Sequence, residues 1–255
     1  MPWYHAVAER DHELLNPFSA EKVRLLGLRL RLGPESRVLD LACGKAGPAL
    51  ILAETGCRIL GVERAPEFVA VARERVAAAG VADRVEIVEG DAAAFPIEPG
   101  AWDVVMMLGA SFVWHGLEGA LEALAPAVPP GGHVVVGEPF WRSWPLPEGI
   151  DDEGWLPLRE TVARIEAAGL ALVTLIASSE DDWDTYESLR WRALEAWLDA
   201  NPREIPTPAR SGGATRPRGT RTCATSARCS PGRSSSPANR RKTFVRQVFG
   251  PRRAG

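Results

Sequence analysis

Between residues 37 and 137 the chain alternates short, almost continuously apolar runs with segments whose apolar residues recur at helical spacing. These runs lack the every-second-residue pattern of a strand with one wet face, so both faces of each run must be buried. A mostly parallel sheet with helices on both of its faces meets that requirement. The sequence therefore predicts a doubly wound α/β fold.

The predicted elements follow one another in a regular order. Strands are expected at 37–42, 58–63, 84–88, 102–108, 133–137 and 170–176. Helices are expected at 19–32, 47–54, 66–79, 117–124, 157–168 and 183–200. We expect residues 3–18 to be irregular, and residues 140–155, which are rich in aromatic residues and proline, to form a loop over the site.

The net charge of −3 conceals two different parts of the chain. Residues 1–208 carry 18 Lys and Arg against 33 Asp and Glu, whereas residues 209–255 carry 12 basic residues and no acidic one. The second part has almost no apolar residue before Phe244, so it cannot bury enough surface to offset its ordering entropy. We therefore expect an N-terminal lid or helical segment at 1–32, an α/β domain at 33–208 and a basic, disordered tail after it.

Two interpretations of the tail stay open. Its charge would bind nucleic-acid phosphates nonspecifically and in a salt-dependent way. Alternatively, its Arg, Gly, Ala, Pro, Ser and Thr are what a GC-rich gene yields when read out of frame, and the abrupt change in composition near residue 210 favours this second interpretation. Under both interpretations the sequence does not clearly predict a seventh, antiparallel strand. Within the tail, only residues 243–249 have a composition that could form one.

Several classes of protein are excluded. The uncharged stretch at residues 104–117 is shorter than the about 20 apolar residues that cross a bilayer. The first residues show no basic-then-apolar signal pattern, so we expect a cytoplasmic protein with no membrane partner. The four cysteines share no CxxC or metal-binding spacing, which predicts free thiols and no metal site. The oligomeric state is left open.

Small and acidic residues follow the first three predicted strands, at the edge where open α/β sheets bind ligands. The first strand leads into Asp40-Leu-Ala-Cys-Gly44-Lys-Ala-Gly47, a tight turn whose backbone can approach a ligand closely. Glu63 ends the second strand, 19 residues after Gly44, where a carboxylate can accept both hydroxyls of a ribose. Asp91 follows the third strand and can meet an adenine edge. Together these residues predict a pocket for an adenosine.

Over about residues 20–180 the chain resembles the class I S-adenosylmethionine-dependent methyltransferases, whose glycine-rich loop Asp-x-Gly-x-Gly-x-Gly looks like residues 40–46 here. Ala42 and Ala46 stand where that loop has its outer glycines, and we expect them to adopt φ below zero and to widen the loop slightly. The resemblance implies a Rossmann-like methyltransferase fold, S-adenosyl-L-methionine as cofactor and a small-molecule methyl acceptor.

The same resemblance implies a role for each residue of the pocket. Glu63, beside Arg64, would take the ribose hydroxyls, and Asp91 with Ala92 would take the adenine. The methionine side would be lined by residues after the fourth strand. The complete set of implied cofactor-binding residues is Asp40, Ala42, Gly44, Glu63, Arg64, Asp91, Ala92, Leu108 and Gly109.

Two other classes of function fit the same fold. A nicotinamide-dependent oxidoreductase would use the same strand edge, but Asp40 would crowd a pyrophosphate, whereas a cationic sulfonium and its amino acid tolerate an acid there. Asp91 also has no standard role in binding a dinucleotide. A protein that binds S-adenosylmethionine without catalysis is the second alternative. These features favour the methyltransferase.

Methyl transfer from a sulfonium is an in-line displacement with an activated leaving group, so a protein can accelerate it by positioning and desolvation. A base is needed only where the acceptor must lose a proton. His115, after the fourth strand, is the predicted base, and Glu138, after the fifth strand, is the second candidate. We expect His5 and His12 to be surface residues. Three tryptophans can either shape an aromatic acceptor pocket or pack in the core: Trp141, Trp144 and Trp155.

Overall fold

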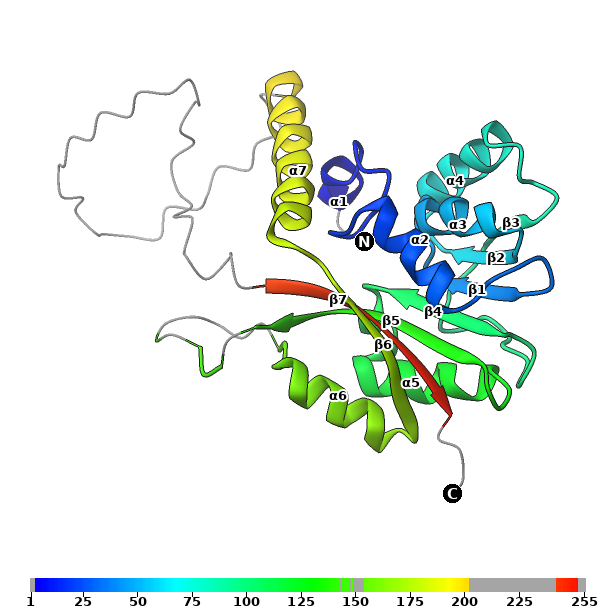
Figure 1. The fold of residues 1–255 in the computed structure, drawn as a ribbon. Coiled ribbons are helices and arrows are strands. Elements are labelled where there is room, and N and C mark those ends of the chain that lie inside the picture. Colours follow the sequence, from blue (N-terminus) through cyan, green and yellow to red (C-terminus); the bar gives the residue numbers. More distant parts are fainter. Residues whose placement is uncertain (1–2, 143, 147, 149–153, 202–241, 252–255) are drawn as a thin grey trace.

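The computed structural model describes residues 3–142, 144–146, 148, 154–201 and 242–251. They form a seven-stranded sheet with the strand order β3-β2-β1-β4-β5-β7-β6 (Figure 1). Its five parallel strands are β1 (Arg37–Leu41), β2 (Arg58–Glu63), β3 (Val85–Glu89), β4 (Val104–Leu108) and β5 (His133–Trp141). The mostly parallel sheet predicted from the apolar runs is confirmed.

The strand order changes direction at β1. From β1 the chain builds outward through β2 to β3, and it then returns to place β4 on the other side of β1. Leu39 of β1 therefore lies opposite Leu60 on one side and Val105 on the other. In an open α/β sheet such a reversal leaves a crevice outside the carboxyl ends of the strands, where ligands bind.

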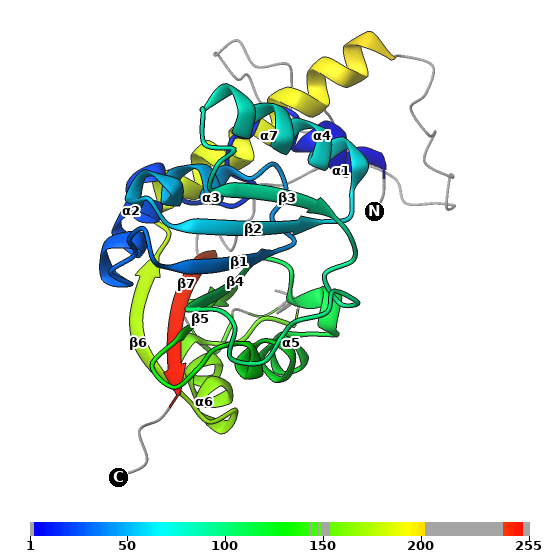
Figure 2. The same cartoon turned by 90° about the vertical axis from the view of Figure 1, so that its right-hand side faces the viewer.

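Helices cover both faces of this sheet (Figure 2). One core is formed with α2 (Ala20–Arg29), α3 (Gly47–Leu52) and α4 (Pro66–Ala78), and the other with α5 (Leu117–Leu124) and α6 (Leu158–Ala167). Neighbouring residues of β1 belong to opposite cores, since Val38 packs in the first and Leu39 in the second. Both are fully buried, which is why the strands need apolar side chains at consecutive positions.

The seventh strand is present and is contributed by the last part of the chain. Residues Lys242–Pro251 form β7, which runs antiparallel between β5 and β6 (Leu170–Ala177). β5 continues to Trp141, beyond its predicted end at 137, and pairs with β7 along that extension. The expectation of a disordered tail from 209 onward is thus corrected over β7, because β5 and β6 both offer unpaired backbone groups that a strand can satisfy. Residues 209–241 and 252–255 lie outside the described residues.

The N-terminal helix and the longest helix lie side by side at the carboxyl edge of the sheet (Figure 1). They are α1 (Trp3–Ala8) and α7 (Glu180–Ala200). The expectation that residues 3–18 are irregular is wrong over α1, because α7 supplies a packing partner that is distant in sequence. The start of α7 is fixed by Ser179, whose side chain accepts a hydrogen bond from the backbone of Asp182. Within the described residues, no helix is long and apolar enough to cross a membrane.

Candidate active site

A cavity of about 250 Å³ lies at the carboxyl ends of the parallel strands and extends to α1 and α7. Most of the predicted cofactor-binding residues line this main cavity, namely Ala42, Gly44, Glu63, Arg64, Asp91, Ala92, Leu108 and Gly109. Asp40 lines instead a smaller cavity, which Gly44 also lines. Strand ends that are far apart in sequence therefore converge as predicted.

The glycine-rich loop between β1 and α3 has a left-handed backbone at three positions. Ala42, Gly44 and Ala46 have φ values of 57°, 56° and 58°, so the expectation of negative φ at both alanines is wrong. A left-handed backbone costs a residue with a Cβ about 1–2 kcal/mol. The loop is held in this form by its surroundings: the Gly44 N–H donates to Glu63 Oε2 at 2.9 Å, and a Cβ on Gly44 would lie only 2.5 Å from Leu15 Cδ1.

Glu63 links the glycine-rich loop to the start of α4. Besides the bond from Gly44, its Oε1 accepts a hydrogen bond from the Ala65 N–H at 2.8 Å, and the residue is buried. Asp91 is exposed at the mouth of the cavity, where its Oδ1 accepts from the Ala93 N–H at 3.0 Å. The cavity wall thus presents one buried and one exposed carboxylate, and both can accept hydrogen bonds from hydroxyl or amino groups.

Residues 9–16, called here the N-terminal strap, are fastened to the glycine-rich loop. The buried Lys45 ammonium donates to two consecutive backbone carbonyls of the strap, the first being that of Glu9 at 2.9 Å. Arg75 of α4 donates to the carbonyls of Glu13 and Lys45, each at 2.9 Å. Burial lowers the pKa of Lys45, and the neighbouring Arg75 charge acts in the same direction. The strap and the loop therefore form one connected wall.

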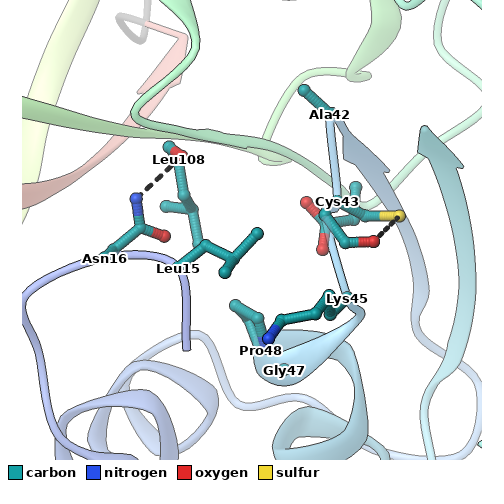
Figure 3. A pocket seen from close by; sticks show the side chains of 10 residues that line it. Leu15, Asn16, Ala42, Cys43, Lys45, Gly47, Pro48 and Leu108 are labelled. Carbon is teal, nitrogen blue, oxygen red and sulfur yellow. Dashed lines mark hydrogen bonds between the residues drawn. The ribbon is translucent and has the colours of Figure 1, made fainter. Parts of the chain in front are cut away.

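The smaller cavity, of about 30 Å³, lies between the strap and the loop (Figure 3). Leu15 and Asn16 approach it from the strap, and the Asn16 Nδ2 donates to the Leu108 carbonyl at 3.1 Å. Asp40 and Cys43 line it from the loop side, and both are buried. Burial, reinforced by the negative charges of Asp40 and Glu63, raises the pKa of the Cys43 thiol, which keeps it protonated.

A polar cluster of Glu9, His12, Tyr186 and Arg190, called here the roof cluster, joins the strap to α7. The Tyr186 hydroxyl donates to Glu9 Oε1 at 2.8 Å, and the His12 Nε2 donates to the Tyr186 carbonyl at 2.9 Å. Glu9 also lies 3.3 Å from His12 Nδ1 and 3.5 Å from Arg190 Nε. Burial and the Glu9 charge raise the pKa of Tyr186, so its hydroxyl stays a donor.

Three roof-cluster side chains, Glu9, Tyr186 and Arg190, line the main cavity together with His5. The expectation that His12 is a surface residue is wrong, since only 3% of it is exposed. Its burial results from α7, which covers the strap. His5 is half-buried.

The two predicted bases have different environments. His115 is exposed and does not line either cavity, so the structure does not bring it to the site. Glu138 does not line either cavity, but it follows Gly137, whose carbonyl accepts from the Gly109 N–H of the cavity wall at 2.8 Å. Its Oε1 is buried and has no hydrogen-bond partner among the described residues. Burial raises the pKa of Glu138 to about 7, although hydrogen bonding from Ser111 acts in the opposite direction.

The tryptophans do not line the main cavity. Trp141 is almost completely buried and its ring lies 6.1 Å from that of Trp155, whereas Trp144 is 48% exposed. Of the two interpretations left open, core packing is the one that Trp141 fits. An aromatic residue at the cavity is instead Phe112, which is 65% exposed at the wall.

Several site residues escaped the sequence analysis. They are Glu9, Leu15, Asn16, Phe68, Phe112 and Arg190. The roof cluster depends on contacts such as that between Glu9 and Tyr186, which are 177 positions apart in the chain. The sequence places Tyr186 in the helix expected at 183–200, but this placement does not identify its partner.

The residues at the cavity fit an S-adenosyl cofactor. The buried Glu63 and the exposed Asp91 supply acceptors for hydroxyl and amino groups, and Gly44 leaves no room for a side chain beside the strap. The acidic and backbone groups of the loop also suit a ligand that carries positive charge better than they suit a pyrophosphate.

Comparison with known proteins gives the same assignment. Residues 38–132 match the family model described as "Methyltransferase domain". The uncharacterized protein YjhP of Escherichia coli is 32% identical over 210 residues, which cover 79% of this chain and 84% of YjhP. Trans-aconitate 2-methyltransferase of Paracidovorax citrulli is 30% identical over 170 residues, which cover 62% of this chain and 63% of that enzyme.

A solved structure extends the similarity to the whole fold. The S-adenosylmethionine-dependent methyltransferase from Thiobacillus denitrificans, in complex with S-adenosyl-L-homocysteine, has a TM-score of 0.81 and 28% sequence identity, and 99% of each chain is covered. These similarities give no support to the oxidoreductase alternative. The chain therefore belongs to the class I S-adenosylmethionine-dependent methyltransferases and transfers methyl groups from S-adenosylmethionine.

Proposed function

We propose that the main cavity holds S-adenosylmethionine at the strand ends and a small-molecule acceptor toward α1 and α7. The observation that carries this proposal is that one continuous cavity is lined both by Glu63 and Asp91 and by Tyr186 and Arg190. When bound, the cofactor supplies a methyl group activated by its sulfonium.

The chain's own residues would hold the two reactants in fixed positions. Glu63 would accept from the ribose hydroxyls, and Asp91 with Ala92 would bind the adenine at the mouth. Leu108 and Gly109 would line the methionine side. The strap and α7 would exclude water on the acceptor side, and this positioning and desolvation suffice for an in-line displacement.

Proton removal is required only for some acceptors, and we assign it to Glu138 as the candidate base. A base with a pKa of about 7 is well matched to proton transfer near neutral pH. Glu138 lies directly after a residue hydrogen-bonded to the cavity wall. His115 remains a prediction from the sequence that its exposed position does not favour.

The acceptor side combines an exposed aromatic residue, Phe112, with the polar groups of Tyr186 and Arg190. This mixture supports an acceptor that has both an apolar part and hydrogen-bonding groups. The trans-aconitate relative, whose name identifies a small organic acid, supports a small-molecule acceptor. A cytoplasmic location remains a prediction from the sequence.

The cofactor assignment can be tested by calorimetry on the full chain. S-Adenosylhomocysteine should bind, and Glu63→Ala should weaken that binding by about 1–3 kcal/mol because polar ligand groups lose their partner. Glu67→Ala, at an exposed position on α4 outside the cavity lining, is the matched control and should bind as the unmodified protein does. Equal affinity in Glu63→Ala, or a preference for NAD, would overturn the assignment. A screen of acceptors with radiolabelled S-adenosylmethionine would then identify the substrate class.

A further inference from the structure

Asn16 stands where the two cavities meet, since it lines both of them. Its Nδ2 donates to the Leu108 carbonyl at 3.1 Å. A carbonyl oxygen can only accept, so the carboxamide cannot be turned the other way round. Figure 3 shows the result: the Asn16 oxygen is turned away from Leu108, toward the side on which Leu15 and the glycine-rich loop lie.

Several hydrogen-bond donors around the smaller cavity are already engaged. In the loop, the Cys43 N–H donates to the Val62 carbonyl, the Gly44 N–H to Glu63 and the Ala46 N–H to the Cys43 carbonyl. The ammonium of Lys45, a loop residue, donates two of its three hydrogens to strap carbonyls. These three backbone N–H groups therefore have no hydrogen to offer a ligand without breaking an existing bond.

The acceptors around the same cavity are Asn16 Oδ1 and the carboxylate of Asp40, which is only 2% exposed. A buried site rich in acceptors favours a ligand group that carries positive charge and several N–H bonds. The volume of about 30 Å³ admits one group of the size of a water molecule or an ammonium. A carboxylate of a ligand would be repelled here.

We propose that Asn16 is a positioning residue that accepts a hydrogen bond from the ammonium group at the amino-acid end of the cofactor. This inference rests on the proposed placement of S-adenosylmethionine in the main cavity. Because Leu108 fixes the carboxamide, Asn16 anchors the methionine chain and so limits where the sulfonium methyl group can point.

The test compares two ligands that differ only in the ammonium group: S-adenosylhomocysteine and its analogue in which hydrogen replaces the amino group. Calorimetry on the unmodified full chain should show about tenfold weaker binding of the analogue, as expected for loss of a hydrogen bond to a charged group. Asn16→Leu, which keeps the shape of the side chain, should weaken S-adenosylhomocysteine about tenfold and leave the affinity for the analogue unchanged. Glu13→Ala, an exposed side chain of the same strap, should leave both affinities unchanged.

A second variant keeps the test decisive if Asn16→Leu disturbs the strap. Asn16→Asp retains an oxygen toward the cavity and should keep the preference for S-adenosylhomocysteine over the analogue. Equal weakening of both ligands in Asn16→Leu, or loss of the preference in Asn16→Asp, would overturn the proposal and mark Asn16 as structural. Failure of the unmodified chain to bind either ligand would instead overturn the proposed cofactor placement itself.

Discussion

The substitution Glu138→Gln should make the protein more stable at alkaline pH and leave its stability at acidic pH almost unchanged. The Glu138 carboxyl is buried with one oxygen lacking a hydrogen-bond partner among the described residues, and its pKa in the folded protein is raised from 4.5 to about 7. A neutral amide has nearly the shape of the protonated carboxyl but cannot ionise. The unmodified protein and the variant should therefore differ in stability only at pH values where the Glu138 carboxyl loses its proton.

The sign and size of the effect follow from proton linkage. Between pH 4.5 and 7 the folded chain keeps a proton on Glu138 that the unfolded chain has released, so stability falls as pH rises through this window. At 1.36 kcal/mol per pKa unit, the shift amounts to about 3 kcal/mol lost by pH 8. Glu138→Gln removes this loss, because the residue no longer titrates.

Urea unfolding of both proteins at pH 5, 6, 7 and 8, followed by circular dichroism, measures this difference directly. The gap in the free energy of unfolding should grow with pH to about 3 kcal/mol. Glu67→Gln, at an exposed site on α4, is the matched control and should show a gap that does not change with pH. Parallel stability curves for Glu138→Gln and the unmodified chain would refute the argument that burial raises this pKa.

Three further predictions concern the roof, the loop and the chemistry. Tyr186→Phe removes the hydroxyl that donates to Glu9 and should lower the free energy of unfolding by about 1–3 kcal/mol in urea melts. Ala42→Gly relieves a left-handed backbone and should raise stability by about 0.5–1 kcal/mol, whereas Ala70→Gly, in the middle of α4, should lower it by about 1 kcal/mol. His115→Ala should leave kcat within about twofold on an identified acceptor, and a loss of about 10²–10⁴ would restore His115 as the base.

The positions of the parallel strands, and their burial on both faces, were predictable because each strand is marked by its own run of apolar residues. β2 was predicted at 58–63, where the structure places Arg58–Glu63, since an apolar run buried on both faces leaves a continuous signal. The placement of Glu63 and Asp91 at one cavity was predictable for a related reason, since both follow strands whose carboxyl ends must meet at one edge. Local sequence sufficed for this half of the site.

The conformation of the loop was not predictable from local preferences. Alanine alone favours a negative φ, and only the surroundings of Ala42 and Ala46 reverse that preference. The bond from Gly44 to Glu63 and the strap against the loop impose the turn. β7 was uncertain for a similar reason, because the free edges of β5 and β6 select it from a segment whose composition does not resemble a folded domain.

The two halves of the site therefore differ in what determines them. In the proposed placement, the cofactor half is built from strand ends, whereas the acceptor half is built from α1, the strap and α7, which meet through side chains far apart in the sequence. Substitutions at Phe112 or Arg190 should accordingly change which acceptor is methylated with little effect on S-adenosylhomocysteine affinity, and substitutions at Glu63 should do the reverse. Glu9 contacts both halves. Its backbone carbonyl accepts a hydrogen bond from Lys45 of the loop, and its carboxylate accepts one from Tyr186 of α7. Glu9 therefore joins the glycine-rich loop to α7.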